Sequence, residues 1–295
     1  MFQGSMVALV TPFKNGELDE EALRNLVEFH INLGTSAIIP CGTTGESATL
    51  SHEEHCRVIE IVVAQANKRI KVIAGAGSNS TKEAIFLTEH AKKSGADAVL
   101  SITPYYNKPT QSGLYEHFKA IAESVDIPLI LYNVPSRTGV NMLPETVLKL
   151  SKLKNIVGIK EASGSLDQAG AILQHTNRNE FVVLSGEDSL TFPMMAMGAT
   201  GVISVVANIC PDKMSKMCNL LLDNKMEEAR KIHYELLDLC KVVFIETNPI
   251  PVKKAVYMMG LIESEIRLPL VQMTDENSKK LENIMVNLGV KIKNK

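Results

Sequence analysis

A lysine ends a short apolar run near the middle of the chain, Asn155-Ile156-Val157-Gly158-Ile159-Lys160-Glu161-Ala162-Ser163. β-Branched residues bounded by polar ones predict a buried parallel strand, and a lysine is rarely buried without a reason. Because side chains alternate along a strand, Lys160 should share a face with Gly158 and Ile156, opposite Glu161. We therefore expect Gly158 to leave space beneath the ammonium group.

Two roles are open for this lysine. A free lysine has a pKa of about 10.4, so that pKa must fall by roughly 3 before the amine is largely neutral at about pH 7 to 8. Burial among apolar neighbours lowers the pKa in this way, and the neutral amine then forms a Schiff base with a carbonyl group. The alternative is a strand-end lysine whose ammonium group extends to water. The neighbouring segments decide between the two roles.

Similar apolar runs recur along the chain and alternate with helical patterns. Eight runs begin near Ser5, Ser36, Lys71, Ala98, Pro128, Ile156, Phe181 and Gly201. Apolar residues recur with helical spacing over 19–33, 51–67 and 80–94. Ser51 with Glu54, and Ser80 with Glu83, have the spacing of capping boxes. Glycines expected to end helices in the left-handed conformation are Gly34, Gly95 and Gly198.

This alternation predicts an α/β protein with a (β/α)8 TIM barrel over residues 1–212, whose active site would collect at the C-terminal ends of the strands. A doubly wound sheet is the alternative, but it usually carries a Gly-x-Gly-x-x-Gly turn after its first strand. Residues 11–16 read Thr-Pro-Phe-Lys-Asn-Gly instead. Helical patterns over 211–223, 225–244, 251–260 and 274–287 exceed the one helix that closes a barrel. They predict a C-terminal helical appendage over residues 213–295.

The composition argues against several classes of function. The chain has 295 residues, of which 45% are hydrophobic and 22% charged. Its net charge is −2, and its 31 lysines and arginines are scattered along the sequence, so that no basic patch indicates binding to nucleic acid or to an anionic membrane. Its five cysteines lack metal-ligand spacing, which favours reduced thiols over a disulfide framework or a zinc site. The sequence shows neither a cationic leader nor an apolar run of membrane-spanning length. We expect a cytoplasmic protein that acts on small molecules.

A loop rich in glycine and threonine, Gly42-Thr43-Thr44-Gly45-Glu46-Ser47, follows the second predicted strand. Its backbone N–H groups and hydroxyls suit an anion such as a substrate carboxylate. The alternative is an ordinary glycine turn whose threonines cap the helix that follows. The loop alone does not separate these interpretations.

Two further strand ends carry polar or aromatic residues. The fifth predicted strand ends Leu131-Tyr132-Asn133-Val134-Pro135-Ser136-Arg137-Thr138-Gly139, so that Tyr132 is placed to move protons and Arg137 to hold a carboxylate. The alternatives are a core phenol and a surface charge. The fourth strand ends Thr103-Pro104-Tyr105-Tyr106-Asn107, an aromatic pair that is usually packing.

Together with Lys160, these residues converge at one end of the predicted barrel, and the sequence closely resembles the dihydrodipicolinate synthase family. That family lies within the pyruvate-dependent class I aldolase and lyase superfamily. The resemblance extends from Gly4-Ser5-Met6-Val7-Ala8-Leu9-Val10-Thr11-Pro12-Phe13 to Asn248-Pro249-Ile250-Pro251-Val252-Lys253. It implies condensation of pyruvate with L-aspartate 4-semialdehyde, on the route to diaminopimelate and lysine, without a metal or organic cofactor.

The resemblance also implies roles for individual residues. Lys160 resembles the residue that forms the imine with pyruvate, and Thr43 and Thr44 match the loop that holds the pyruvate carboxylate. Thr44 would also belong to a proton relay with Tyr132 and Tyr106. Because Tyr106 is expected to come from a neighbouring subunit, the resemblance implies a homo-oligomer, a tetramer built as a dimer of dimers.

The substrate side of the site is implied by further matches. Arg137 resembles the residue that receives the carboxylate of the semialdehyde, and matches that line or support the site are Gly186, Ile203 and Asn248. An N-acetylneuraminate or 2-keto-3-deoxy-sugar aldolase would share Lys160 and Tyr132 but would not be expected to carry Arg137. A non-catalytic ligand-binding relative should have lost Lys160 or Tyr132. The residues present favour the synthase.

Other positions resemble the lysine site of feedback-inhibited members of the family. They are Ser47, Ala48, His52, His55, Asn79, Glu83 and Tyr105. Glu83 would pair with an ammonium group, and Asn79 and Tyr105 would offer neutral hydrogen bonds. The alternative is that the histidines are exposed helix residues and Glu83 completes a capping box. We expect L-lysine to inhibit from a site distinct from the pyruvate pocket.

Overall fold

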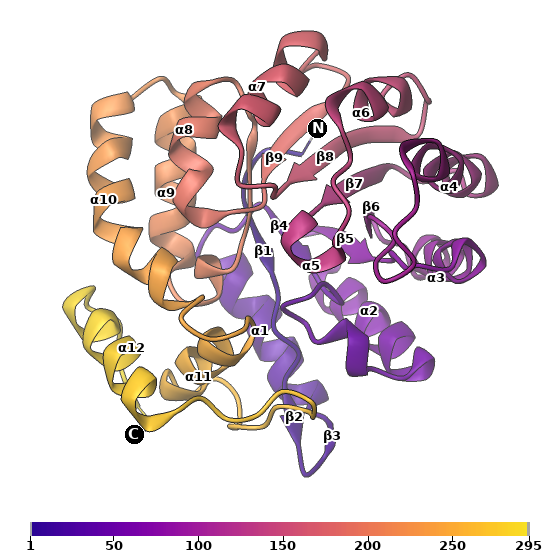
Figure 1. The fold of residues 1–295 in the computed structure, drawn as a ribbon. Coiled ribbons are helices and arrows are strands. Elements are labelled where there is room, and N and C mark those ends of the chain that lie inside the picture. Colours follow the sequence, from indigo (N-terminus) through magenta and orange to yellow (C-terminus); the bar gives the residue numbers. More distant parts are fainter. Residues whose placement is uncertain (1, 294–295) are drawn as a thin grey trace.

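The computed structural model describes residues 2–293, and a closed barrel of eight parallel strands lies at its centre (Figure 1). The strands are β1 (Gly4–Ala8), β4 (Ala37–Ile39), β5 (Lys71–Gly75), β6 (Ala98–Ile102), β7 (Leu129–Asn133), β8 (Ile156–Glu161), β9 (Val182–Ser185) and β10 (Gly201–Ser204). Each strand pairs with its neighbours along the chain, and β1 closes the barrel by pairing with both β4 and β10. The predicted (β/α)8 barrel is confirmed.

Helices surround the barrel and connect its strands (Figure 1). They are α1 (Glu20–Asn32), α2 (His52–Ala66), α3 (Thr81–Ser94), α4 (Gln111–Ser124), α5 (Pro135–Thr138), α6 (Pro144–Leu150), α7 (Leu166–His175) and α8 (Thr191–Ala196), followed by α9 (Pro211–Leu222), α10 (Met226–Val242), α11 (Ile250–Met258) and α12 (Asp275–Asn287). Short 3-10 helices η1 (Ser47–Thr49), η2 (Asp188–Leu190) and η3 (Val206–Asn208) follow three of the strands. A hairpin of β2 (Phe13–Lys14) and β3 (Glu17–Leu18) follows β1.

One of the two predicted capping boxes forms. Ser51 accepts a hydrogen bond from the Glu54 N–H at 3.2 Å, and the Glu54 carboxylate accepts from the Ser51 N–H at 2.9 Å. The box predicted at Ser80 is wrong, because the Ser80 side chain makes no capping bond to α3. The Glu83 carboxylate instead accepts from Ser78 and His52. Gly34, Gly95 and Gly198 all have the positive φ expected of helix ends.

The start of β8 departs from simple alternation. A register shift between Leu129 and Ile130 of β7 faces this point, and both Ile156 and Ile159 pack in the core between strands and helices. The expected space beneath Lys160 is also wrong: a Cβ at Gly158 would lie 2.4 Å from Cγ2 of Val182. Gly158 therefore permits close approach of β9 and does not leave a void.

The C-terminal helices gather beside one part of the barrel (Figure 1). α9 packs against β1 and α10, and α12 packs against α10 and α11. The Lys213 ammonium of α9 donates to the Leu288 carbonyl at 3.1 Å, which joins α9 to the end of α12. The predicted division at residues 212 and 213 falls inside α9, and that helix occupies the place of the barrel's eighth helix. The division into domains stays a prediction.

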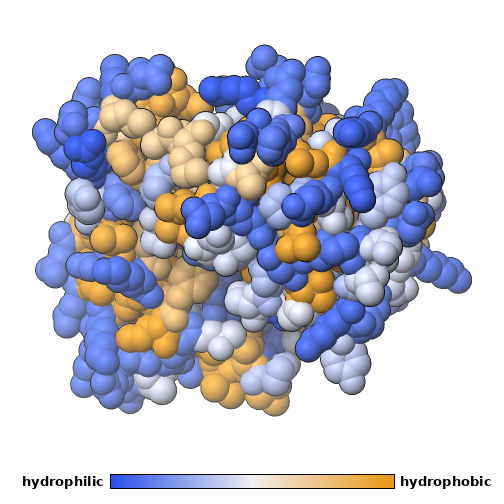
Figure 2. Space-filling model, turned by 45° about the horizontal axis from the view of Figure 1, so that its top comes forward, coloured by the Kyte–Doolittle hydropathy of each residue, from blue (hydrophilic) through white to orange (hydrophobic). Residues whose placement is uncertain are grey.

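The surface is mixed. Figure 2 shows hydrophilic side chains over much of one face, with apolar side chains in patches between them. Among large apolar residues, Tyr106 is 90% exposed and Leu268 is 77% exposed. Within residues 2–293 we find no helix that combines the length and apolar character needed to cross a membrane.

Candidate active site

Lys160 lies at the C-terminal end of β8 and is 6% exposed. In the parallel pair β7–β8 it is the register partner of Tyr132, and its Nζ lies 4.3 Å from the centre of the Tyr132 ring. Within residues 2–293 the amine makes neither a hydrogen bond nor a salt bridge. A buried amine that no carboxylate holds is available to attack a carbonyl carbon.

The threonine loop folds as a series of turns after β4. The Gly45 N–H donates to the Gly42 carbonyl and the Glu46 N–H to the Thr43 carbonyl, each at 3.1 Å. Thr44 is 3% exposed, and its hydroxyl accepts a hydrogen bond from Nδ2 of Asn248 at 3.0 Å. Residues 204 positions apart thus fix the hydroxyl that the sequence assigns to substrate binding.

Arg137 reaches the same place from α5, the short helix after β7. Its Nη2 donates to the backbone carbonyl of Asn248 at 3.2 Å. The side-chain oxygen Oδ1 of Asn248 is buried and has no hydrogen-bond partner within residues 2–293. Asn248 therefore holds both Thr44 and Arg137 and keeps one acceptor for a bound molecule.

A cavity of about 950 Å³ joins these groups at the C-terminal end of the barrel. Predicted residues that line it are Thr43, Thr44, Tyr132, Arg137, Lys160, Gly186 and Asn248. Gly186 is required here, because a Cβ would lie 2.5 Å from that of Ala162. Ile203 is 1% exposed and packs in the interior of the barrel, so it supports the cavity from below rather than lining it.

Two carboxylates in this cavity were not predicted. Glu187 and Asp188 come after Gly186 in the loop that follows β9, and they line the same cavity as Lys160. Asp188 is 3% exposed and accepts from the N–H groups of Val205 and Val206 at 3.0 and 3.1 Å. Burial raises the pKa of Asp188, and hydrogen bonds and the charge of Lys160 oppose that rise. The available signal was their place immediately after a predicted strand.

Glu187 differs from Asp188 because its carboxylate makes no hydrogen bond within residues 2–293. Burial and the neighbouring charges of Glu161 and Asp188 raise the pKa of this carboxyl group. A cationic group bound beside Glu187 would favour the charged carboxylate and so lower this pKa again.

Tyr106 does not reach the cavity of its own chain. It is 90% exposed, has φ of +70°, and sits on the loop between β6 and α4. Its neighbour Tyr105 lines a second cavity. The placement of Tyr106 as part of the relay stays a prediction.

The second cavity, of about 550 Å³, contains most of the residues expected to bind lysine. Ser47, Ala48, His52, His55, Glu83 and Tyr105 line it. His52 contacts Glu83 at 2.6 Å, whereas the buried His55 contacts the Gly75 carbonyl at 2.8 Å. Asn79 does not line the cavity, but its side chain donates to the Tyr105 carbonyl at 3.1 Å.

The two cavities are neighbours. Gly42, Thr43, Tyr132, Arg137 and Asn248 line both. The expected lysine site is therefore a different set of residues from the pyruvate site, but the two share a wall.

Fold and cavity define a (β/α)8-barrel enzyme with a buried lysine in a cavity at the C-terminal ends of its strands. The chain matches the Dihydrodipicolinate synthetase family over residues 1–288, and it belongs to that family. It is 60% identical over 285 residues to the 4-hydroxy-tetrahydrodipicolinate synthase of Geotalea daltonii, covering 97% of this chain and 98% of the relative.

Two solved structures show the same fold with ligands. One is the chloride-inhibited dihydrodipicolinate synthase from Acinetobacter baumannii complexed with pyruvate, at 48% identity and a TM-score of 0.96, covering 98% of this chain and 100% of that one. The other is the enzyme from Cyanidioschyzon merolae with lysine bound, at 41% identity and a TM-score of 0.95, covering 98% of each chain.

Proposed function

We propose that this chain is a 4-hydroxy-tetrahydrodipicolinate synthase, which condenses pyruvate with L-aspartate 4-semialdehyde. The observation that carries the proposal is one cavity containing a buried, unpaired Lys160 beside Tyr132, with the Thr43–Thr44 loop and Arg137 on its walls. An amine nucleophile, a phenol and two places for carboxylates are what a reaction between a keto acid and an acidic aldehyde requires.

The chemistry begins at Lys160. Its amine adds to the keto carbon of pyruvate and water leaves, so that the resulting imine nitrogen can accept electrons. The methyl group of pyruvate then becomes acidic, and a phenol relay through Tyr132 takes its proton. The enamine carbon attacks the aldehyde carbon of the second substrate, whose oxygen takes up a proton, and the bond to Lys160 is again an imine. The amino group of the semialdehyde, after losing a proton, adds to that imine carbon and displaces the Lys160 amine, which closes the ring of 4-hydroxy-tetrahydrodipicolinate and frees the enzyme. The Thr43–Thr44 loop holds the pyruvate carboxylate during these steps.

The semialdehyde carries both a carboxylate and an ammonium group. Arg137 receives the carboxylate, because its fork matches the two carboxylate oxygens. The unpartnered Oδ1 of Asn248 and the unpaired carboxylate of Glu187 lie in the same cavity and suit the ammonium group. An amino-acid aldehyde thus matches the charges of this cavity better than a neutral sugar.

An assay with paired substrates tests the proposed function. Purified protein should consume pyruvate with L-aspartate 4-semialdehyde at least about a hundredfold faster than with N-acetylmannosamine, because an uncharged aldehyde leaves Arg137 without a partner. Measuring pyruvate consumption with each aldehyde at equal concentration gives the ratio. A ratio near one, or a preference for N-acetylmannosamine, would support a sugar aldolase instead.

We also propose that the protein acts in the cytoplasm as a homotetramer built as a dimer of dimers. The exposure of Tyr106, with 90% of its surface accessible, supports a contact between chains, because a neighbouring chain would both cover the ring and bring it to a catalytic cavity. In the proposed relay Tyr106 would then act beside Thr44 and Tyr132 of the neighbouring chain.

L-Lysine is proposed as an inhibitor that binds in the second cavity. The Glu83 carboxylate and the Tyr105 ring supply an anionic partner and a polar contact for an amino acid. Because this cavity shares Thr43 and Tyr132 with the catalytic one, a bound lysine needs to affect only one common wall to slow the reaction.

Millimolar L-lysine is therefore expected to lower kcat, and excess pyruvate should not fully restore it. Glu83→Ala should abolish the inhibition, because it removes the anionic partner of the ammonium group. Glu89→Ala, on the exposed side of the same helix, is the matched control and should stay inhibited. Full activity of the unmodified protein in lysine would show that these residues have a structural role only.

A further inference from the structure

A buried ion pair lies directly behind the threonine loop. The Lys253 ammonium donates to Oε1 of Glu46 at 2.6 Å, and the two side chains are 4% and 2% exposed. Glu46 ends the loop that begins at Gly42, whereas Lys253 lies in the first turns of α11, 207 positions along the chain. The catalytic chemistry described above does not use either residue.

The pair is connected to the catalytic residues through short covalent and hydrogen-bonded links. The Glu46 N–H donates to the Thr43 carbonyl at 3.1 Å, and Glu46 itself has a left-handed φ of +54°. On the other side, Lys253 is in the same segment as Asn248, whose side chain holds the Thr44 hydroxyl. The segment from 248 to 253 therefore holds the threonine loop at two points.

The surroundings keep this pair in one geometry. The second oxygen of Glu46 accepts from the Arg267 N–H at 3.1 Å. The Phe13 ring is 1% exposed and lies 4.4 Å from Nζ of Lys253 and 4.1 Å from Cζ of Arg267. Burial lowers the pKa of Lys253, and the Glu46 charge opposes that effect. The Glu46 carboxylate thus accepts from Lys253 and from the Arg267 backbone N–H, and the Lys253 ammonium donates to Glu46 and lies over the Phe13 ring.

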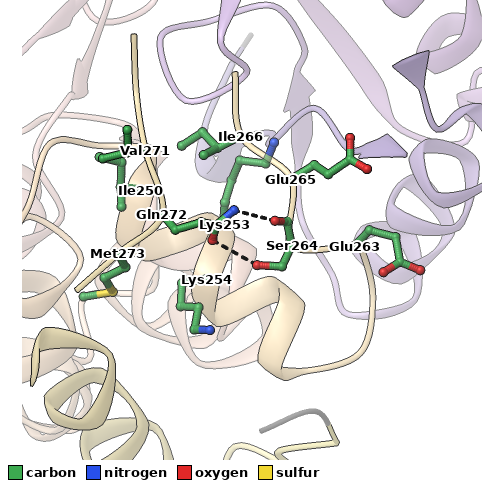
Figure 3. A pocket seen from close by; sticks show the side chains of 10 residues that line it. All are labelled: Ile250, Lys253, Lys254, Glu263, Ser264, Glu265, Ile266, Val271, Gln272 and Met273. Atoms are coloured by element: carbon green, nitrogen blue, oxygen red, sulfur yellow. Dashed lines mark hydrogen bonds between the residues drawn. The ribbon is translucent and has the colours of Figure 1, made fainter. Parts of the chain in front are cut away.

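Figure 3 shows the same helix from the side of the segment 263–273, which crosses α11. The pocket there, lined by Lys253, Lys254 and Glu265 among others, has a volume of about 10 Å³ and so accommodates about one water molecule. Hydrogen bonds between Ser264 and Gln272 close this segment on itself. Lys253 is therefore enclosed on this side as well, with 4% of its side chain exposed.

We infer that Glu46 and Lys253 are positioning residues, whose ion pair holds the Thr43–Thr44 loop in the conformation that binds the pyruvate carboxylate. The inference rests on the proposed function, because it assigns the loop to pyruvate. Loss of the pair should weaken pyruvate binding more than it changes the chemical step, since the loop holds pyruvate, whereas Lys160 and Tyr132 lie on β8 and β7 and only Thr44 of the proposed relay lies on the loop.

Trapping of the pyruvate adduct with borohydride, without any aldehyde, measures pyruvate binding and imine formation separately from use of the second substrate. Glu46→Gln, Lys253→Met and the double variant should each raise the pyruvate concentration for half-maximal trapping by about tenfold. Each single substitution leaves one buried charge without its counter-charge and should lower Tm, but Glu46→Gln should lower it less, because it is isosteric and its amide oxygen still accepts from Lys253. Glu227→Gln is the matched control at an exposed ion pair and should leave trapping unchanged.

The double variant separates positioning from stability. Removing both charges should recover much of the Tm that Lys253→Met loses, because no buried charge stays unpaired. The raised pyruvate requirement should persist in that variant, since the loop has lost its anchor. A double variant with recovered Tm and an unchanged pyruvate dependence would overturn the inference. An unmodified protein that traps no pyruvate would overturn the proposed function itself, and this inference with it.

Discussion

Replacement of Lys160 by alanine is expected to lower kcat by about 10,000-fold or more, because it removes the buried amine that forms the imine with pyruvate. Lys241, the other lysine at the cavity wall, is 67% exposed and lies 4.0 Å from the Asp238 carboxylate, so it does not replace Lys160. The amine makes neither hydrogen bond nor salt bridge within residues 2–293, so its removal should leave the fold and Tm intact. Turnover is measured with both substrates in excess.

The site of the adduct gives a second test of the same residue. Borohydride with pyruvate should add the mass of a reduced pyruvyl group to the peptide that contains Lys160 and to no other. Lys154→Ala is the matched control, because Lys154 is exposed just before the opposite end of the same strand. An adduct on another lysine, or normal turnover of Lys160→Ala, would show that the nucleophile lies elsewhere.

The barrel was predictable because its strands are buried on both sides and therefore appear as short apolar runs. The run expected near Pro128 begins at Leu129, and the run expected near Ser5 begins at Gly4. The β2–β3 hairpin was not predicted, because each strand has only two residues and two residues carry no period. Whether a strand could be predicted from its periodicity thus depended on how many residues it has.

Local sequence spacing predicted side-chain contacts less well where a residue distant in the sequence makes the contact instead. Ser80 and Glu83 have the spacing of a capping box, yet Glu83 bonds to His52, which is 31 positions away. Likewise Gly158 suggested an empty space, but the side chain that fills it belongs to Val182 on the next strand. In both cases the deciding partner comes from another element of the fold.

The sequence indicated single residues of the site but not the contacts that these residues make with distant parts of the chain. Residue type marked Lys160, Tyr132 and Arg137 individually, because each sits at or just after a strand end. Their common cavity followed from the barrel, in which all strand ends meet on one side. The bond from Asn248 to Thr44 and the pair Glu46–Lys253 join residues more than 200 positions apart, and no local pattern announces them.

Arg137→Ala is expected to lower kcat/KM for L-aspartate 4-semialdehyde by about 30-fold, which corresponds to roughly 2 kcal/mol. This is the range for a hydrogen-bonded ionic contact, and the larger values seen for fully buried pairs are not expected because the Arg137 side chain is exposed at the cavity wall. Steady-state rates against semialdehyde concentration, at saturating pyruvate, give the ratio.

Imine formation should be spared in the same variant. Arg137 contacts Asn248 through the backbone carbonyl only, so its loss leaves the bond from the Asn248 side chain to Thr44 in place. The pyruvate dependence of borohydride trapping should therefore stay within about twofold of that of the unmodified protein. A parallel loss of trapping would show that Arg137 supports the pyruvate site instead.

Lysine at position 137 distinguishes charge from geometry. Arg137→Lys keeps the positive charge but loses the planar fork, so it should recover only part of the activity that alanine loses. Arg178→Ala, at an exposed arginine before β9, is the matched control and should not change kcat/KM. If Arg137→Ala used the semialdehyde as well as the unmodified protein does, the carboxylate would have to bind elsewhere. The choice of an acidic aldehyde over a sugar would then lose its structural basis, because Arg137 is the residue that separates the two classes of substrate.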